Sequence, residues 1–395
     1  MARDGQLLDQ QPGIDSRIYA LYSFGLHLRL LRIPDLRQMI RSLQSWRFIF
    51  ALMIFLHHFP VDGKGLFAAG GSCGVSFFLV LSGFVMSAGY GERVLQNDFN
   101  YGNYFKKRLT RVYPLHLLCL CVAALLLVMA GAFGLKNGVV LGINALLLQS
   151  WIPVKEIYFS FNAVSWCLCD LLFFYVMFPL LHRFSARIGL GKSIVLTGMA
   201  AVIYFVIMYS IPENWAHPLL YISPLFRLLD FVIGMLLYDV YRRMIGSERI
   251  VRRLKSIPYL LKSLAETVPI ILLSVFIIIF PVIPEKFICA SFWWIPSCFL
   301  ILTFAAASQT GGGMFSRLLE NKTLVYLGNI SFSFYMVHQL GIRILNILFD
   351  KTGIGTPWYI NLALFAAIIL AGSIIVSRYF EKPVVTALNR KLIRV

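Results

Sequence analysis

Arg47 and His58 are the residues whose types and spacing most clearly suggest chemistry. They stand at the two ends of RFIFALMIFLHH, an otherwise apolar segment. On a helix, eleven steps of about 100° bring His58 back to within about 20° of Arg47, roughly 16 Å further along. One polar stripe is therefore predicted, with His58 as general base. The structural alternative is that Arg47 snorkels to headgroups and His58 bonds a neighbouring carbonyl. His57 points about 100° away, which favours packing.

Arg108 and Arg111 lie in the segment FKKRLTRVYP, three residues apart and therefore on one face of a helix. Two neighbouring guanidinium groups suit a phosphate, because each planar fork can donate two parallel hydrogen bonds. The same residues also fit an ordinary cytoplasmic anchor of a membrane helix.

Other ionisable residues lie within apolar segments, where a charge needs a partner or a polar cavity. Trp166 and Asp170 share a helix face, four residues apart, in VSWCLCDLLFFYVMFP. Arg227 and Asp230 are three residues apart and are predicted to neutralise each other.

His338 is a second histidine deep in an apolar segment, which also contains Tyr335 and Arg343. Counted from the inner ends of their predicted helices, His58 and His338 lie at similar depth, about 15 residues in. Two histidines at one depth, above arginines that lead toward the cytoplasm, favour a reaction chamber over isolated packing residues.

Membrane-spanning helices must position these residues. Of the 395 residues, 59% are hydrophobic and 14% charged, whereas about a quarter of a soluble chain is charged. We therefore predict an all-α, polytopic transmembrane helical bundle of about ten spanning helices. The predicted spans are 42–60, 73–90, 112–131, 163–182, 193–211, 219–241, 264–283, 287–307, 323–348 and 357–380.

The basic residues orient these spans. With the N-terminus inside, five of the 36 Lys and Arg residues fall outside and two fall within spans, which leaves about 29 on the inner side. This bias predicts a multi-pass protein of the bacterial inner (cytoplasmic) membrane with both termini cytoplasmic. It also accounts for the net charge of +18, so we expect a lipid bilayer as partner and no nucleic acid.

Two regions do not fit this scheme. Residues 138–153 are short and interrupted, and a re-entrant segment, an interfacial segment and an eleventh span all remain open. Residues 17–34 are either a helix on the inner leaflet or a disordered lead-in. The seven cysteines all lie in apolar stretches, so we interpret them as small buried hydrophobes and expect neither disulfides nor a metal site.

Several segments, in their order, make the chain similar to the acyltransferase-3 family of integral membrane acyltransferases. After Arg47 and His58 come GVSFFLVLSGFVMS (74–87), Arg-x-x-Arg before Tyr113-Pro114, SWCLCDLLFFYVMFP (165–179), LGNISFSFYMVHQ (327–339) and YFEKP (379–383). The resemblance covers residues 41–385, and its GVSFF–LSGF and Ser-Phe-Tyr-x-x-His segments are specific. The family modifies bacterial surface glycans, antibiotics and related molecules.

The resemblance implies transfer of an acyl group, usually acetyl, from cytoplasmic acyl-CoA to a hydroxyl or amine. The family's essential pair maps onto Arg47 and His58, and its coenzyme A-binding arginines map onto Arg108 and Arg111. We predict an acetyl-CoA-dependent O-acyltransferase that acts on a hydroxyl of a cell-surface glycan or of its lipid-linked precursor. Direct transfer with His58 as base and an acyl-histidine relay both remain open.

The match departs from the family at one carboxylate. Members usually carry Glu directly before the position of Leu172; here Leu171 stands there, and Asp170 lies one residue earlier. Its side chain points about 100° away from the usual direction. The supporting candidates, as orienting groups or oxyanion donors, are Ser82, Trp166, Asp170, Tyr335, His338 and Glu381.

The predicted organisation is a cytoplasmic N-terminal extension (1–40), a membrane domain (41–385) and a cytoplasmic tail (386–395). The main rival function is a proton-coupled secondary transporter, because buried Arg, His and Asp also build proton pathways. Against it, the second half does not repeat the first, and neither histidine has a carboxylate near it in the sequence. A sensor or scaffold would not require the arginine stripe.

Overall fold

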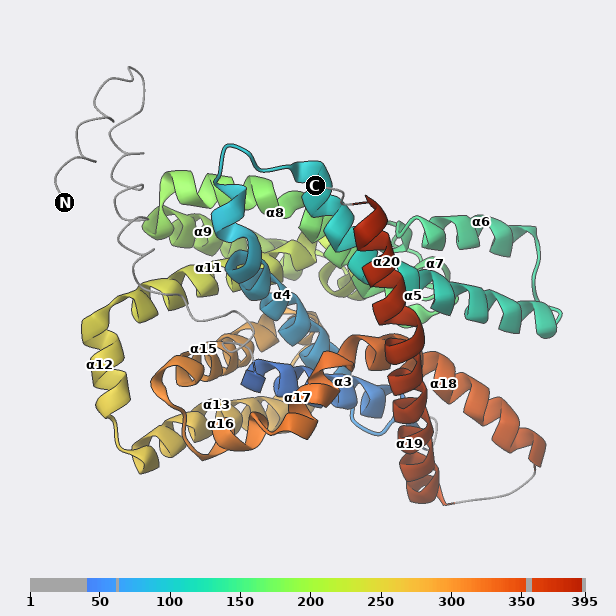
Figure 1. Ribbon diagram of the computed structural model, residues 1–395. Coiled ribbons are helices and arrows are strands. Elements are labelled where there is room, and N and C mark those ends of the chain that lie inside the picture. Colours follow the sequence, from blue (N-terminus) through green and yellow to red (C-terminus); the bar gives the residue numbers. More distant parts are fainter. Residues whose placement is uncertain (1–40, 62–63, 353–356, 393–395) are drawn as a thin grey trace.

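Helices make up nearly all of the structure, a computed structural model that describes residues 41–61, 64–352 and 357–392 (Figure 1). The long helices are α3 (Arg41–His58), α4 (Gly70–Val94), α5 (Tyr101–Met129), α8 (Trp166–Ile188), α9 (Leu190–Ser210), α11 (Pro224–Gly246), α13 (Tyr259–Ile279), α15 (Trp294–Thr310), α18 (Ser331–Thr352) and α19 (Trp358–Val376). The shorter helices are α6 (Leu135–Ala145), α7 (Lys155–Tyr158), α10 (Glu213–Ala216), α12 (Glu248–Ser256), α14 (Glu285–Ile288), α16 (Met314–Leu319), α17 (Lys322–Asn329) and α20 (Lys382–Leu392). Strands β1 (Pro60–Val61) and β2 (Lys64–Gly65) pair antiparallel.

Eight of the described helices are long and apolar enough to cross a membrane, and α11 with its bent lead-in would be a ninth. α3 corresponds to the first predicted span, although two arginines and two histidines make it less apolar. It lies inside the bundle, against α4, α17 and α18, where its polar groups can meet partners (Figure 1). The predicted polytopic transmembrane helical bundle is confirmed.

Glycines fix α4 at the centre of the bundle. A Cβ at Gly83 would collide with the carbonyl oxygen of Phe231, and one at Gly234 would collide with that of Val80. α4 and α11 therefore touch backbone to backbone, a close approach typical of membrane helices. Gly83 belongs to the LSGF part of the family segment, so this motif has a packing role in the structure.

The predicted span 112–131 corresponds to the C-terminal part of a longer helix, α5. α5 begins at Tyr101, where the side chain of Asn100 caps it by accepting a hydrogen bond from the backbone N–H of Asn103 (2.8 Å). Charged residues end an apolar run without ending a helix. Arg108 and Arg111 are consequently held inside a continuous helix, and their spacing keeps them on one face.

The predicted span 323–348 is divided into α17 and α18, with the break at Ile330. Before the break, α17 approaches α3 closely, because a Cβ at Gly328 would collide with the carbonyl oxygen of Gln44. α17 thus packs against the start of α3, and α18 takes a separate course that carries Tyr335 and His338.

Residues 138–153 form no continuous spanning helix. They comprise most of α6, which has 11 residues, and a short 3₁₀ turn, Gln149–Trp151. Eleven residues extend about 16 Å, against roughly 30 Å of hydrocarbon. Leu147 between them has a positive φ of 54°, which breaks the helix. Of the three alternatives left open for this segment, the eleventh span is therefore excluded. Residues 17–34 lie outside the described part of the chain.

All seven cysteines are free, and five of them are buried. Cys298 is half-buried, whereas Cys121 on α5 is exposed, so the prediction of uniformly buried cysteines is wrong at that position. The described residues contain no group of three or more His, Cys, Asp or Glu side chains that could hold a metal ion.

Candidate active site

His58 and His338 come from helices 280 residues apart in sequence and meet in the bundle. Nε2 of His338 lies 3.2 Å from Nδ1 of His58, and the ring centroids are 5.1 Å apart. His338 is fully buried, whereas His58 is only half-buried. The accessible ring is thus supported from behind by an inaccessible one.

The hydrogen bonds fix the tautomers of both rings if both are neutral. Nδ1 of His338 lies 2.6 Å from the carbonyl oxygen of Tyr335, which can only accept, so this nitrogen carries the proton. Nε2 of His338 is then an acceptor for the N–H at Nδ1 of His58, which also points to the carbonyl oxygen of Ile54 (2.9 Å). The lone pair of His58 is left on Nε2, which has no hydrogen-bond partner among the described residues. His58 is therefore arranged as a base.

His57 has a different environment. Its Nδ1 lies 2.9 Å from the carbonyl oxygen of Ala68, and its ring packs so closely over Gly71 that a Cβ there would meet it at 2.8 Å. This supports the predicted packing role.

Arg47 lies on α3 below His58, about 16 Å along the helix axis. One guanidinium nitrogen donates to the side-chain oxygen of Gln44 (2.9 Å). Its electrostatic neighbours include Arg111 and Glu381, so the arginine of α3 and the second arginine of α5 belong to one charged region.

Glu381 connects three segments in that region. Its carboxylate forms an ion pair with Arg111 on α5 and accepts a hydrogen bond from the hydroxyl of Ser333 on α18. The carboxylate side chain is 2% exposed, whereas 38% of the Arg111 side chain is exposed. A short π-helical turn, Ser377–Glu381, between α19 and α20 presents it. Arg111 is thus held by a buried anion while much of its guanidinium-bearing chain remains accessible.

Arg108 is held by α4. It donates to the hydroxyl of Tyr90 (2.7 Å) and to the sulfur of Met86 (3.7 Å), and its guanidinium lies 4.6 Å above the Tyr90 ring. Ser82 lies one turn before Met86 on the same face of α4, and Phe78, one turn earlier again, contacts Tyr335. This face leads from Arg108 toward the helix that carries His338.

The other supporting candidates lie outside direct reach of His58. Tyr335 donates its hydroxyl to the carbonyl oxygen of Val164 (2.8 Å), so that hydroxyl is engaged in fixing α18. Trp166 is buried in the core with its ring 4.9 Å from that of Tyr221. Both positions are consistent with supporting roles in packing.

Asp170 belongs to a second buried cluster, around Arg227. The Arg227 guanidinium lies 3.2 Å from the Asp230 carboxylate, as predicted, and donates to Ser76 (3.0 Å) and to the carbonyl oxygen of Cys289 (2.6 Å). The three charged side chains are fully buried, and Asp170 is an electrostatic neighbour of both others. This cluster joins α4, α8 and α11, and it positions helices without touching either histidine.

Sequence reasoning missed Ser76 and Ser333. Each is a fully buried hydroxyl that bonds a charged residue far away in sequence. The available signal was their place inside GVSFF and SFSFY, where a serine stands directly beside aromatic residues. That signal shows a buried polar group but does not reveal its partner.

The candidate site in this membrane bundle thus consists of two contacting histidines, the charged region of Arg47, Arg111 and Glu381, and Arg108 on the same face of α5 as Arg111. The acyltransferase-3 family model, described as an acyltransferase domain, matches residues 40–378, and the chain belongs to this family. The predicted resemblance is confirmed, and the protein is an integral membrane acyltransferase.

Curated relatives agree with this assignment. Acyltransferase MdmB of Streptomyces mycarofaciens is 27% identical over 396 residues, which covers 92% of this chain and 94% of that protein. The putative acetyltransferase ORF330 of Acidianus two-tailed virus is 31% identical over 175 residues, 44% of this chain and 48% of that protein. Protein 2 in the picA locus of Rhizobium radiobacter is 29% identical over 87 residues, 22% of this chain and 46% of that protein. No solved structure matches the chain.

Proposed function

We propose that the protein is an O-acyltransferase that transfers an acyl group, above all acetyl, from cytoplasmic acyl-CoA to a hydroxyl of a cell-surface glycan or of its lipid-linked precursor. The observation that carries the proposal is the contact between His58 and His338, which leaves Nε2 of His58 free to act as a base. The arginines supply a counterpart for an anionic donor.

In this proposal the nucleotide part of acyl-CoA binds at Arg108, Arg111 and Arg47. Planar guanidinium groups suit phosphates, and the Arg111 side chain stays 38% exposed although it is paired with Glu381. The pantetheine arm then extends along the α3 stripe, and the face of α4 with Ser82 and Met86 forms part of its path. The roughly 16 Å from Arg47 to His58 separates donor recognition from chemistry.

Direct transfer follows from the tautomer of His58. Nε2 accepts the proton of the acceptor hydroxyl as its oxygen attacks the thioester carbonyl carbon. The carbon–sulfur bond breaks, the thiolate of coenzyme A leaves, and the imidazolium returns the proton to sulfur. Nε2 of buried His338 accepts a hydrogen bond from the Nδ1–H of His58 and keeps that ring oriented as positive charge develops on it. The products are the acyl ester and free coenzyme A.

An acyl-histidine relay uses the same geometry. Nε2 of His58 attacks the thioester carbon, the carbon–sulfur bond breaks, and the coenzyme A thiolate leaves and takes a proton from water. The acceptor hydroxyl then attacks the acyl carbon of the acyl-imidazolium, the carbon–nitrogen bond breaks to regenerate neutral His58, and the hydroxyl proton is released to water. This route separates the donor step from the acceptor step, which suits a donor and an acceptor on opposite sides of the membrane.

The test is thioester consumption by the purified protein. With acetyl-CoA and candidate glycan acceptors, we expect release of free thiol that depends on the acceptor and matches the ester formed. Absence of thiol release with every acyl-CoA tested, together with proton-driven solute uptake into proteoliposomes, would replace the acyltransferase proposal by the transporter.

The donor site makes a quantitative prediction. Arg108→Ala and Arg111→Ala should each raise the KM for acyl-CoA by about 10- to 150-fold, because each removes charge-assisted hydrogen bonds. Lysine should rescue only in part, since the planar fork is lost. Lys106→Ala, an exposed cation in the same segment, is the matched control.

Arg111→Ala also leaves buried Glu381 without its cation, so Arg111→Ala with Glu381→Gln separates binding from folding. The assignment fails if both alanine variants bind acyl-CoA like the Lys106 variant.

The proposed location is the bacterial inner membrane with both termini cytoplasmic. Residues 138–153 form no spanning helix, which supports the proposal that the helices after them have the predicted orientation. Cysteine-accessibility labelling should place positions near 100, 187, 250, 315 and 390 on the cytoplasmic side. Labelling of 250 and 315 from the outside would invert the second half of this topology.

A further inference from the structure

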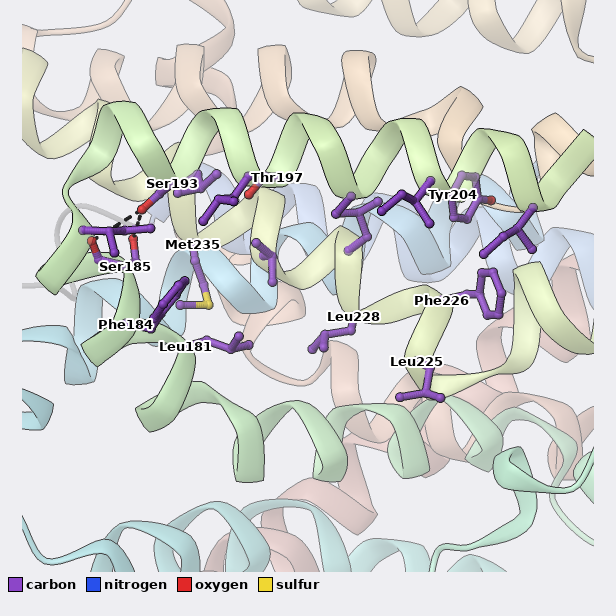
Figure 2. A pocket seen from close by; sticks show the side chains of 18 residues that line it. Leu181, Phe184, Ser185, Ser193, Thr197, Tyr204, Leu225, Phe226, Leu228 and Met235 are labelled. Atoms are coloured by element: carbon purple, nitrogen blue, oxygen red, sulfur yellow. Dashed lines mark hydrogen bonds between the residues drawn. The ribbon is translucent and has the colours of Figure 1, made fainter.

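A groove of about 390 Å³ runs between α8, α9 and α11, separate from the histidines and the arginines (Figure 2). Its walls are apolar over almost their whole length, with Leu196, Ala200 and Ile203 from α9 facing Leu228 and Leu229 from α11. The α9 wall extends from Ser193 to Ile207, a distance of about 21 Å along the helix axis. The length and the apolar walls of the groove thus suit an extended hydrocarbon chain.

This groove faces the hydrocarbon of the bilayer. Only 17% of the apolar window of α9 is buried within the protein, compared with 72% for α4, so α9 stands at the edge of the bundle. Phe184 and Ile203, which line the groove, are more than half exposed. An apolar groove in this position is not filled by water, and an empty one would lose packing contacts along its length.

One end of the groove is polar and basic. The hydroxyl groups of Ser185 and Ser193 lie 2.9 Å apart across the turn at Gly189 (Figure 2). Arg187 and Lys192 flank this turn and are exposed. No acidic residue occurs between Asp170 and Glu213 in the sequence.

The carboxylate of Asp239 lies three residues after Leu236, the last groove residue on α11, and has Arg242 and Arg243 as electrostatic neighbours. Arg183 is engaged elsewhere, with the carbonyl oxygen of Val94 and the ring of Phe99. Among the described residues, neither Arg187 nor Lys192 forms an ion pair, so both cations at this turn are available to an anion.

We infer that this groove is a lipid-binding site that holds one acyl chain of an anionic bilayer phospholipid, with the lipid phosphate at Arg187 and Lys192. The apolar walls provide the affinity for the chain, and the two cations provide the preference for an anionic headgroup. The two serine hydroxyls, which bond each other and the carbonyl oxygen of Gly189, give this end of the groove the polarity of the lipid ester region. This site is independent of the proposed acyl transfer.

Native mass spectrometry of the purified full-length protein tests the site, with phosphatidylglycerol and phosphatidylcholine of identical chains as probes. The unaltered protein should retain one phosphatidylglycerol in preference to phosphatidylcholine. Arg187→Gln with Lys192→Gln should weaken phosphatidylglycerol binding by roughly 30-fold and remove the preference. Arg249→Gln with Arg253→Gln, two exposed cations on α12, should leave it unchanged.

A second pair of variants tests the groove itself. Ala200→Trp fills it, whereas Met199→Trp puts the same ring on an exposed neighbouring position that does not line it. Only Ala200→Trp should lose the retained lipid and the rise in unfolding temperature on lipid addition. Equal retention by these two variants, or equal retention of both lipids by the unaltered protein, would overturn the inference.

Discussion

Replacing His58 by alanine should reduce acyl transfer by about 10²–10⁴-fold while the protein still folds and inserts. The imidazole provides the Nε2 lone pair that the proposed chemistry requires, and no other described histidine has its free nitrogen in this place. The His58 side chain is half-buried and belongs to the polar stripe of α3, so its removal leaves only a small cavity in the apolar core. Initial rates with saturating acetyl-CoA and acceptor, alongside thermal unfolding, measure both effects.

His57→Ala is the matched control and should retain most activity, because that ring bonds the carbonyl oxygen of Ala68 rather than His338. His338→Ala should lower kcat by less than His58→Ala does, because His338 orients the reacting ring and does not itself take the proton. Full activity of the His58 variant would contradict the assignment of His58 as the reacting base. Labelled acyl trapped on His58 in denatured enzyme would favour the relay, whereas its absence under single-turnover conditions would favour direct transfer.

Replacing Arg227 by leucine should destabilise the folded protein by about 3–5 kcal/mol, because it removes one partner of a fully buried ion pair. The Asp230 carboxylate would keep its burial and lose its cation, and the bonds to Ser76 and to Cys289 would also be lost. We expect a large fall in unfolding temperature and in yield, measured in detergent.

The double variant Arg227→Leu with Asp230→Asn separates charge from packing. It removes the uncompensated Asp230 charge as well, so part of the lost stability should return, whereas buried Asp170 still lacks its cation. Arg249→Leu, an exposed arginine on α12, is the control. If Arg227→Leu unfolds at the temperature of that control, the cluster does not hold α4, α8 and α11 together.

The sequence predicted those parts of the fold that depend on local periodicity. Apolar runs located the ten long helices, and the eleven-residue spacing placed Arg47 and His58 on one side of α3. The i, i+3 spacing also predicted the pair of Arg227 with Asp230, which the structure has at 3.2 Å.

Contacts between distant segments could not be predicted in this way. The depth of His338 in its predicted helix suggested proximity to His58, but only the packing of α18 against α3 brings the rings to hydrogen-bonding distance. Glu381 was a candidate by motif alone, and its ion pair with Arg111 depends on the turn after α19. The start of α5 and the break before α18 were missed because hydropathy marks the edge of the hydrocarbon and does not mark where a helix ends.

The ion pair between Arg111 and Glu381 also has a consequence for biogenesis. These partners are 270 residues apart, and at 5–20 residues per second a ribosome needs about 14–54 s to make the intervening chain. During that interval Arg111, whose side chain stays 38% exposed even in the finished protein, can keep its charge hydrated at the membrane surface. Glu381 becomes almost fully buried, but it is synthesised after Arg111, so its cation is already present when it folds. The order of synthesis therefore leaves the partly exposed Arg111 unpaired for that interval, whereas Glu381 is never buried without its cation.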